Sequence, residues 1–119
     1  MAKKNIIKEK SFAFAFRIIK LSKHLSEDKK EFVLSKQLLR SGTAIGALIR
    51  EAEHAESKYD FIHKISIALK EANETDYWIE LIKYGNYISD IEYNSLKPDI
   101  EEINKILVSI KKSSKESLQ

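Results

Sequence analysis

The chain has 119 residues with 21 basic and 18 acidic side chains, a formal net charge of +3, three glycines, one proline and no cysteine. This length suits one domain with its own core, and the absence of cysteine excludes disulfides and is typical of a reducing compartment. The sequence has neither a signal-peptide pattern nor an apolar run of the roughly 18 residues that cross a bilayer, so we expect a soluble, cytoplasmic protein. Few glycines and prolines favour long helices over many short strands.

The first predicted helix covers about residues 8–26 and is apolar on two sides. Alternating spacings of four and three residues give it one core seam, formed by Phe14, Ile18, Leu21 and Leu25. Phe12, Phe16 and Ile19 fall on nearly the opposite side. This apolar arc is too wide for the surface helix of a monomer, which suggests a contact with another subunit.

The second predicted helix, about residues 31–56, contains two glycines near its middle. Its seam is Leu34, Leu38, Ser41, Ile45, Leu48, Ala52 and Ala55. Gly42 and Gly46 lie together beside this seam, although a glycine inside a helix costs roughly 1 kcal/mol relative to alanine. Close approach of another helix would offset that cost. The approaching helix belongs either to the same bundle or to a second subunit.

The third predicted helix covers residues 58–84, and Ser57 with Asp60 resembles a capping box at its start. Gly85 follows its last apolar position, where a left-handed residue is expected. The core seam is Phe61, Ile65, Ala68, Ala72, Thr75, Ile79 and Ile82. A second line on nearly the opposite side mixes apolar and acidic residues, namely Ile67, Glu71, Glu74, Trp78 and Leu81.

The fourth predicted helix covers about residues 90–112 and begins with a second capping box, Ser89 and Glu92. Its seam is Tyr93, Leu96, Ile100, Ile103, Leu107 and Ile110. The seam keeps its phase through Pro98, which favours one kinked helix; a break at Lys97 is the alternative. We expect the polar tail after residue 112 to fray.

Together these segments predict an all-α, antiparallel up-down-up-down four-helix bundle that forms a single domain over residues 1–119. Di-iron bundles carry Glu-x-x-His pairs, and the chain offers Glu51 with His54 and, more loosely, Asp60 with His63. Three of these four side chains, Glu51 and both histidines, point away from the seams. We therefore expect no metal, no cofactor, no catalytic residue and no enzymatic activity.

Three stretches carry a family resemblance: "KSFAFAFRIIKL", the run from "LSKQLLRSGTAIGALIREAEHAESKYDF" to "ISIALKEANETDYWIELI", and "ILVSIKKS". They resemble the four helix bundle proteins known as 23S rRNA intervening-sequence proteins, over about residues 10–113. The most specific part is residues 37–51 combined with residues 67–78. The chain departs from the family's "SIGANI" pattern at Ala44 and Leu48, which removes any polar role at those two positions.

The resemblance implies a bacterial protein whose relatives are encoded in segments inserted in ribosomal RNA genes and form ring-like homopentamers. A similar bundle is the accessory protein of diversity-generating retroelements, where it binds nucleic acid and a reverse transcriptase. For this chain, the resemblance indicates the general class of such bundle proteins and does not identify a particular partner.

Two functional hypotheses follow. The first is an accessory protein that binds nucleic acid, with RNA as the expected ligand, through phosphate contacts of the cations Arg17, Lys20, Lys36, Arg40 and Arg50. The alternative for each cation is a solvated face or an ion pair with Glu71 or Glu74. No aromatic residue is interleaved on these strips, which favours phosphate contacts over base stacking. The second hypothesis is a structural or adaptor oligomer that binds a protein partner.

We also predict a homo-oligomer assembled through the outer sides of the first and third helices, with the number five taken from the resemblance alone. The predicted interface consists of Phe12, Phe16, Ile19, Gly42, Gly46, Ile67, Glu71, Glu74, Trp78 and Leu81. Arg40 or Arg50 of the next subunit would neutralise the two glutamates. The alternative is that these residues complete the core of the monomer.

Overall fold

The computed structural model describes the backbone of residues 2–118 and the side chains of residues 6–118. Within this range the chain forms four helices. The helices are α1 (Ala2–Glu27), α2 (Leu34–Glu53), α3 (Lys58–Tyr84) and α4 (Asp90–Glu116). The predicted all-α class with four helices is therefore confirmed. None of these helices has a stretch long and apolar enough to cross a membrane, within the described residues.

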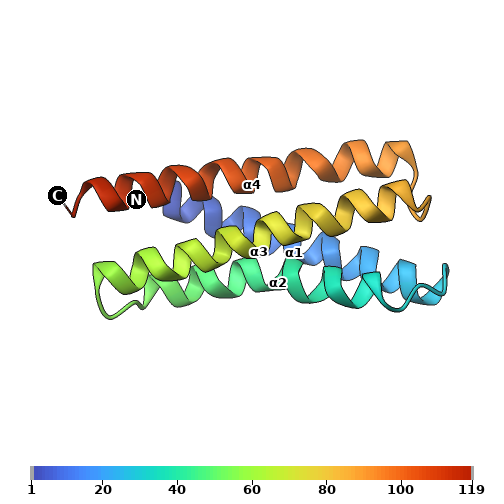
Figure 1. Cartoon of the computed structure of the whole chain (residues 1–119), viewed down its shortest axis with the longest axis horizontal. Coiled ribbons are helices and arrows are strands. Elements are labelled where there is room, and N and C mark those ends of the chain that lie inside the picture. Colours follow the sequence, from blue (N-terminus) through green and yellow to red (C-terminus); the bar gives the residue numbers. More distant parts are fainter. Residues whose placement is uncertain (1, 119) are drawn as a thin grey trace.

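The helices lie side by side along the long axis of the molecule, and the chain turns back after α1, α2 and α3 (Figure 1). The molecule measures 49 × 23 × 19 Å along its principal axes. Both α1 and α3 pack against α2 and α4, so α1 and α3 lie diagonally across the core. α1 and α4 share the fewest contacts of the four neighbouring pairs, and α2 and α3 share the most.

Two helices, α1 and α4, are longer than the sequence predicts, and tertiary contacts accompany the extension of α1. α1 begins at Ala2 rather than at residue 8. Ile7, one heptad before Phe14, is buried, and Lys8 Nζ pairs with Glu53 Oε2 at 3.2 Å. α4 continues to Glu116, so most of the tail expected to fray is helical.

α2 is shorter than predicted, at residues 34–53 rather than 31–56, and the Glu31 side chain satisfies backbone amides at its N-terminus. The Glu31 carboxylate accepts hydrogen bonds from the backbone amides of Leu34 at 3.0 Å and Ser35 at 2.8 Å. Lys30 precedes it with a φ of 57°, which reverses the chain just before the cap. The positive end of the helix dipole also stabilises a carboxylate at this position.

The predicted start of α3 and both ends of its range are confirmed, with one correction at its C-terminus. Ser57 Oγ accepts a hydrogen bond from the Asp60 amide at 3.0 Å. Gly85 has a φ of −77°, and the left-handed residue is Asn86, with a φ of 63°. Asparagine tolerates this region better than most residues, so it can reverse the chain one position later.

α4 begins with the predicted capping box, in which Ser89 and Glu92 exchange hydrogen bonds between side chain and backbone. The helix includes Pro98, so the interpretation as one continuous helix is confirmed and the alternative break at Lys97 is wrong. Proline removes one backbone donor here without ending the helix.

The predicted seams meet in one core. Its fully buried large side chains include Phe14, Ile18, Leu38, Ile45, Ile79, Ile100 and Leu107. Leu21, Leu34, Leu48, Phe61 and Tyr93 are only partly buried against it. The polar seam positions Ser41 and Thr75 are also buried, and their hydroxyl oxygens lie 2.9 Å apart, so each hydroxyl has a partner.

Both glycines of α2 face α1 of the same chain. A Cβ atom on Gly42 would lie 2.8 Å from Ile18 Cγ2, whereas one on Gly46 would lie 3.4 Å from Ser11 Oγ. Close packing of α1 on α2 therefore explains these residues. The prediction that these glycines belong to a subunit interface is therefore corrected, because both lie at a contact between helices of the same chain.

The two glycines differ in the space available for a side chain, which predicts different effects of an alanine substitution on stability. Gly42→Ala should lower the free energy of unfolding by about 1–2 kcal/mol, because buried, β-branched Ile18 has little room to move. Gly46→Ala should leave it unchanged or raise it by up to about 1 kcal/mol through helix propensity. Urea denaturation of both variants measures the difference, and equal effects would contradict the packing account.

A charge network joins α3 to α4. Lys97 Nζ donates to Asp76 Oδ1 at 2.5 Å and to Glu80 Oε1 at 2.7 Å, and the Tyr93 hydroxyl donates to the same Glu80 oxygen at 2.6 Å. Hydrogen bonds from Lys97 and then Tyr93 lower the pKa of Glu80 below its ordinary value. Burial by itself would lower the pKa of Lys97, but its bonds to Asp76 and Glu80 outweigh burial and raise it.

This network predicts an acid-sensitive part of the stability. A lowered pKa in the folded state means that Glu80 stabilises the fold above the ordinary carboxyl pKa of 4.5 and that this contribution is lost as the pH falls below it. Glu80→Gln should therefore be less stable than the parent at pH 7, with a gap that narrows below about pH 4.5. The control is Glu101→Gln, at an exposed carboxylate on α4. Parallel acid denaturation curves for the parent and Glu80→Gln would count against the network.

Candidate nucleic-acid interface

The adjacent helices α1 and α2 each contain a long segment without carboxylates. Residues 10–26 and residues 32–50 contain no aspartate or glutamate. The two segments lie against each other, since Ser22 Oγ donates to the Ser35 carbonyl at 2.9 Å and Gly42 abuts Ile18. We call this surface the α1/α2 face and define it by its exposed residues Phe12, Phe16, Ile19, Lys20, Lys36, Leu39 and Arg50.

Three cations of this face form no ion pair with any described side chain. Lys20, Lys36 and Arg50 are all exposed and belong to none of the ion pairs within residues 6–118. Lys36 and Arg50 are separated by nearly four helical turns, which places them on the same side of α2. These positive charges are therefore available to a ligand.

Two of the cations lie over exposed aromatic rings. The Arg50 guanidinium carbon is 5.6 Å from the centre of the Phe12 ring, and Lys20 Nζ is 4.9 Å from the centre of the Phe16 ring. The Phe12–Arg50 pair joins α1 to α2 and depends on how the two helices align. The expectation that no aromatic residue is interleaved with the cations is therefore wrong.

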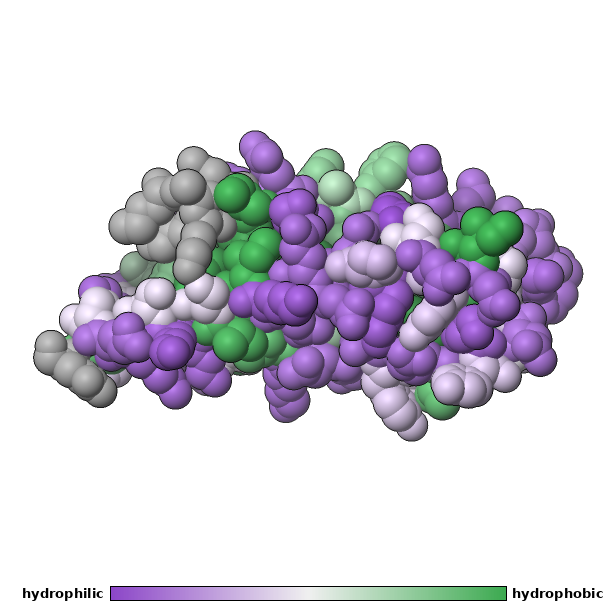
Figure 2. All heavy atoms as spheres, turned by 90° about the horizontal axis from the view of Figure 1, so that it is seen from above, coloured by the Kyte–Doolittle hydropathy of each residue, from purple (hydrophilic) through white to green (hydrophobic). Residues whose placement is uncertain are grey.

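Arg17, which the sequence places on the same basic strip, is engaged by α4 instead. Its Nη1 donates to Asp99 Oδ2 at 2.6 Å and to the Ser95 carbonyl at 3.1 Å. Lys10 pairs with Glu102 of α4 at 2.8 Å in the same way. Hydrophilic side chains accordingly cover the middle of the surface seen from the α4 side (Figure 2). The acid-free strip predicted for α1 does not exist where α4 supplies these carboxylates.

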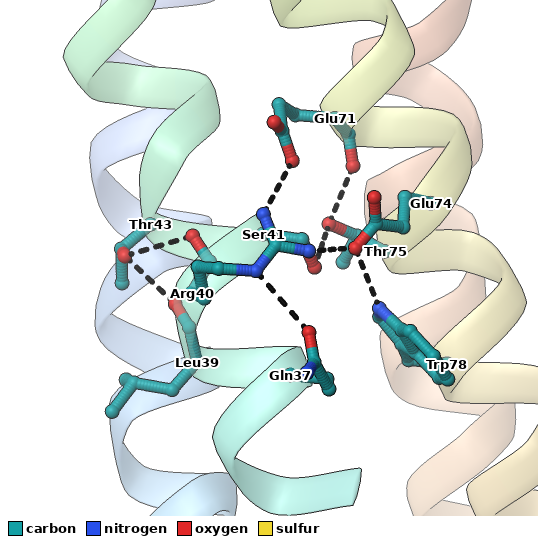
Figure 3. Close-up of polar contacts among 9 residues, drawn as sticks. All are labelled: Gln37, Leu39, Arg40, Ser41, Thr43, Glu71, Glu74, Thr75 and Trp78. Carbon is teal, nitrogen blue, oxygen red and sulfur yellow. Dashed lines mark hydrogen bonds and ion pairs between the residues drawn. The ribbon is translucent and has the colours of Figure 1, made fainter.

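Arg40 is engaged by α3 within the same chain (Figure 3). Its Nη1 donates to Glu71 Oε1 at 3.2 Å, and its Nη2 pairs with Glu74. Glu74 Oε2 also accepts the indole N–H of Trp78 at 3.0 Å. The two glutamates therefore obtain their cation from their own chain, and the prediction that a neighbouring subunit supplies it is corrected.

The apolar part of the predicted interface divides into two groups. Ile67 and Trp78 of α3 are half-buried, and Trp78 packs against the core of its own chain. Leu81 remains 36% exposed. On α1, in contrast, Phe12 is 62% exposed, Phe16 54% and Ile19 47%, so these side chains do not complete the core of the monomer.

The histidine motifs remain apart from this face. His54 and His63 are exposed, and no group of three or more histidine, aspartate or glutamate side chains within the described residues could hold a metal ion. A groove between α1 and α4, lined by residues that include Lys20, Leu21, Ile88 and Leu96, carries no such cluster among the described residues either.

Fold and surface together define a small four-helix protein that presents free cations and exposed aromatic rings on one pair of helices. The chain belongs to the family of 23S rRNA-intervening sequence proteins, whose model matches residues 3–109. It is also similar to a crystal structure described as a protein of unknown function from the S23 ribosomal protein family of Bacteroides thetaiotaomicron. That similarity has 58% identity and a TM-score of 0.91, and covers 92% of this chain and 98% of that one. No curated protein matches the chain.

The two arginines of α2 should differ in their effect on stability. Arg40→Gln should lower the free energy of unfolding by about 1 kcal/mol, because it removes a paired guanidinium from two carboxylates. Arg50→Gln should change it by less than about 0.5 kcal/mol, since no carboxylate depends on it. Thermal denaturation at low and high salt measures both variants. A larger loss for Arg50→Gln would contradict the division between paired and free arginines.

Proposed function

We propose that this chain is a non-enzymatic, antiparallel up-down-up-down bundle that serves as an RNA-binding or other nucleic-acid binding accessory protein. The observation that carries the proposal is that Lys20, Lys36 and Arg50 form no ion pair within residues 6–118 and lie on two helix segments that contain no aspartate or glutamate. Arg17 and Arg40 are removed from the predicted binding set because carboxylates of α4 and α3 already neutralise them.

Phosphate contacts suit this arrangement physically. A cation that is already paired gains little from a phosphate, because it must first leave its carboxylate. A free lysine or arginine releases counterions from the nucleic acid when it binds, and this release gives the binding its salt dependence. The family's link to 23S rRNA segments is consistent with a nucleic-acid partner and identifies no particular RNA.

A structural or adaptor oligomer is the second candidate function, and exposed Phe12, Phe16 and Ile19 favour it. Contiguous apolar side chains in water mark interaction sites. In this alternative the outer side of α1 is buried between subunits, in a homopentamer if this chain assembles as the relatives implied by the resemblance do. Light scattering at micromolar concentration distinguishes a pentamer from a monomer.

Charge reversal tests the nucleic-acid proposal. Three phosphate contacts predict that log K for an RNA fragment falls with log[salt] with a slope of about −2 to −3. Lys36→Glu with Arg50→Glu should abolish retention on RNA without changing helicity. The matched control reverses two exposed lysines of α4, Lys105→Glu with Lys112→Glu, and should retain most of the binding.

The outcome separates the two candidates. Equal losses in the two double variants would mean that only net charge matters, and the α1/α2 face would lose its role. An absence of RNA binding at low salt, together with an oligomeric mass, would favour the adaptor.

A further inference from the structure

Phe12 and Phe16 are an unusual pair of surface residues. They are one helical turn apart on the same side of α1, and more than half of each side chain is exposed. Each has its own cation, Arg50 for Phe12 and Lys20 for Phe16. Exposed aromatic rings next to free positive charges provide stacking surfaces and phosphate contacts at the same place.

The charges on this face favour a polyanion over a second copy of the chain. A symmetric contact between two α1/α2 faces would bring Lys20, Lys36 and Arg50 close to their own copies. A contact with α3 of another copy would meet Glu71 and Glu74, which Arg40 already neutralises. A nucleic-acid strand offers negative charge and flat apolar surfaces together, so it complements both the cations and the rings.

We propose that Phe12 and Phe16 stack against bases of a single-stranded nucleic acid, while Lys20, Lys36 and Arg50 contact the phosphates on either side. This inference rests on the proposed nucleic-acid function and specifies the form of the ligand. Every base has a face that can stack, so the recognition is tolerant of sequence. A duplex is a poorer ligand, because its bases are already stacked and paired.

The packing of α1 on α2 positions these groups. Gly46 lies next to Ser11, the residue before Phe12, and this close approach lets Arg50, one turn further along α2, reach the Phe12 ring. The Arg50 guanidinium then lies over the Phe12 ring, within reach of the phosphate of a nucleotide that stacks on the part of the ring that stays exposed. Lys20 holds the equivalent position next to Phe16, one turn along α1.

An abasic oligonucleotide separates stacking from phosphate contacts. Fluorescence anisotropy at low salt measures the affinity of the protein for three labelled ligands at equal concentration. The ligands are an unstructured RNA of about 12 nucleotides, an abasic strand of the same length and an RNA duplex. The parent protein should bind the base-containing strand about tenfold or more tightly than the abasic strand, and more tightly than the duplex.

The test variant is Phe12→Leu with Phe16→Leu, which keeps apolar, helix-forming side chains but removes both rings. It should bind the base-containing strand only as tightly as the abasic strand, with an unchanged salt slope. The matched control, Tyr59→Leu with Tyr77→Leu, removes two exposed rings from α3 and should bind as the parent does. Circular dichroism checks that all variants are folded.

Three results would overturn the inference. Equal binding of the base-containing and abasic strands by the parent would leave phosphate contacts, and so the proposed function, intact without stacking. No binding of either strand at low salt would overturn the proposed function as well. A smaller mass of the double Phe variant in light scattering, with an equal loss for both strands, would identify the face as a contact between subunits.

Discussion

The close approach of α1 and α2 is the constraint on which the rest of this surface depends. Gly42 is buried against Ile18, and a side chain there would push the two helices apart. The approach brings together two segments that lack carboxylates, and it aligns Arg50 with Phe12. Helix packing thus converts two separate basic and apolar patterns into one continuous face.

The distribution of carboxylates decides which cations are free. Acidic residues of α3 and α4 form ion pairs with arginines of the neighbouring helices. Glu71 and Glu74 pair with Arg40, and Asp99 pairs with Arg17. These pairs lie along the contacts of α2 with α3 and of α1 with α4. Apart from the Lys8–Glu53 pair, the contact between α1 and α2 is closed mainly by apolar and small residues, and Lys20, Lys36 and Arg50 form no ion pair within residues 6–118.

Much of the fold could be predicted from the sequence, because the signals concerned are local. The seams follow from spacing along one helix, and the caps at Ser57 and Ser89 need only three or four consecutive residues. The early start of α1 could not be predicted in this way, since it depends on burial of Ile7 in the core. The range of α3 was predicted correctly, but the left-handed residue that follows it is Asn86 rather than Gly85.

The site was harder to predict than the fold, because its charges depend on neighbours that are distant in sequence. A helical wheel shows that Arg17 and Arg50 face outward but not that only Arg17 meets a carboxylate from another helix. Lys20 and Phe16, four residues apart, could have been paired from the sequence, whereas Arg50 and Phe12 could not.

The contacts that stabilise the fold and the groups of the proposed binding face consequently lie in different parts of this bundle. The Lys97 network and the Arg40 pairs stabilise the chain between helices, and a ligand that competed for them would weaken the fold. The cations and rings of the α1/α2 face lie outside the core, so a ligand can engage them without disturbing the packing beneath. Gly42 and Gly46 contribute to the face indirectly, because they allow α1 and α2 to pack closely and so set the relative positions of its side chains.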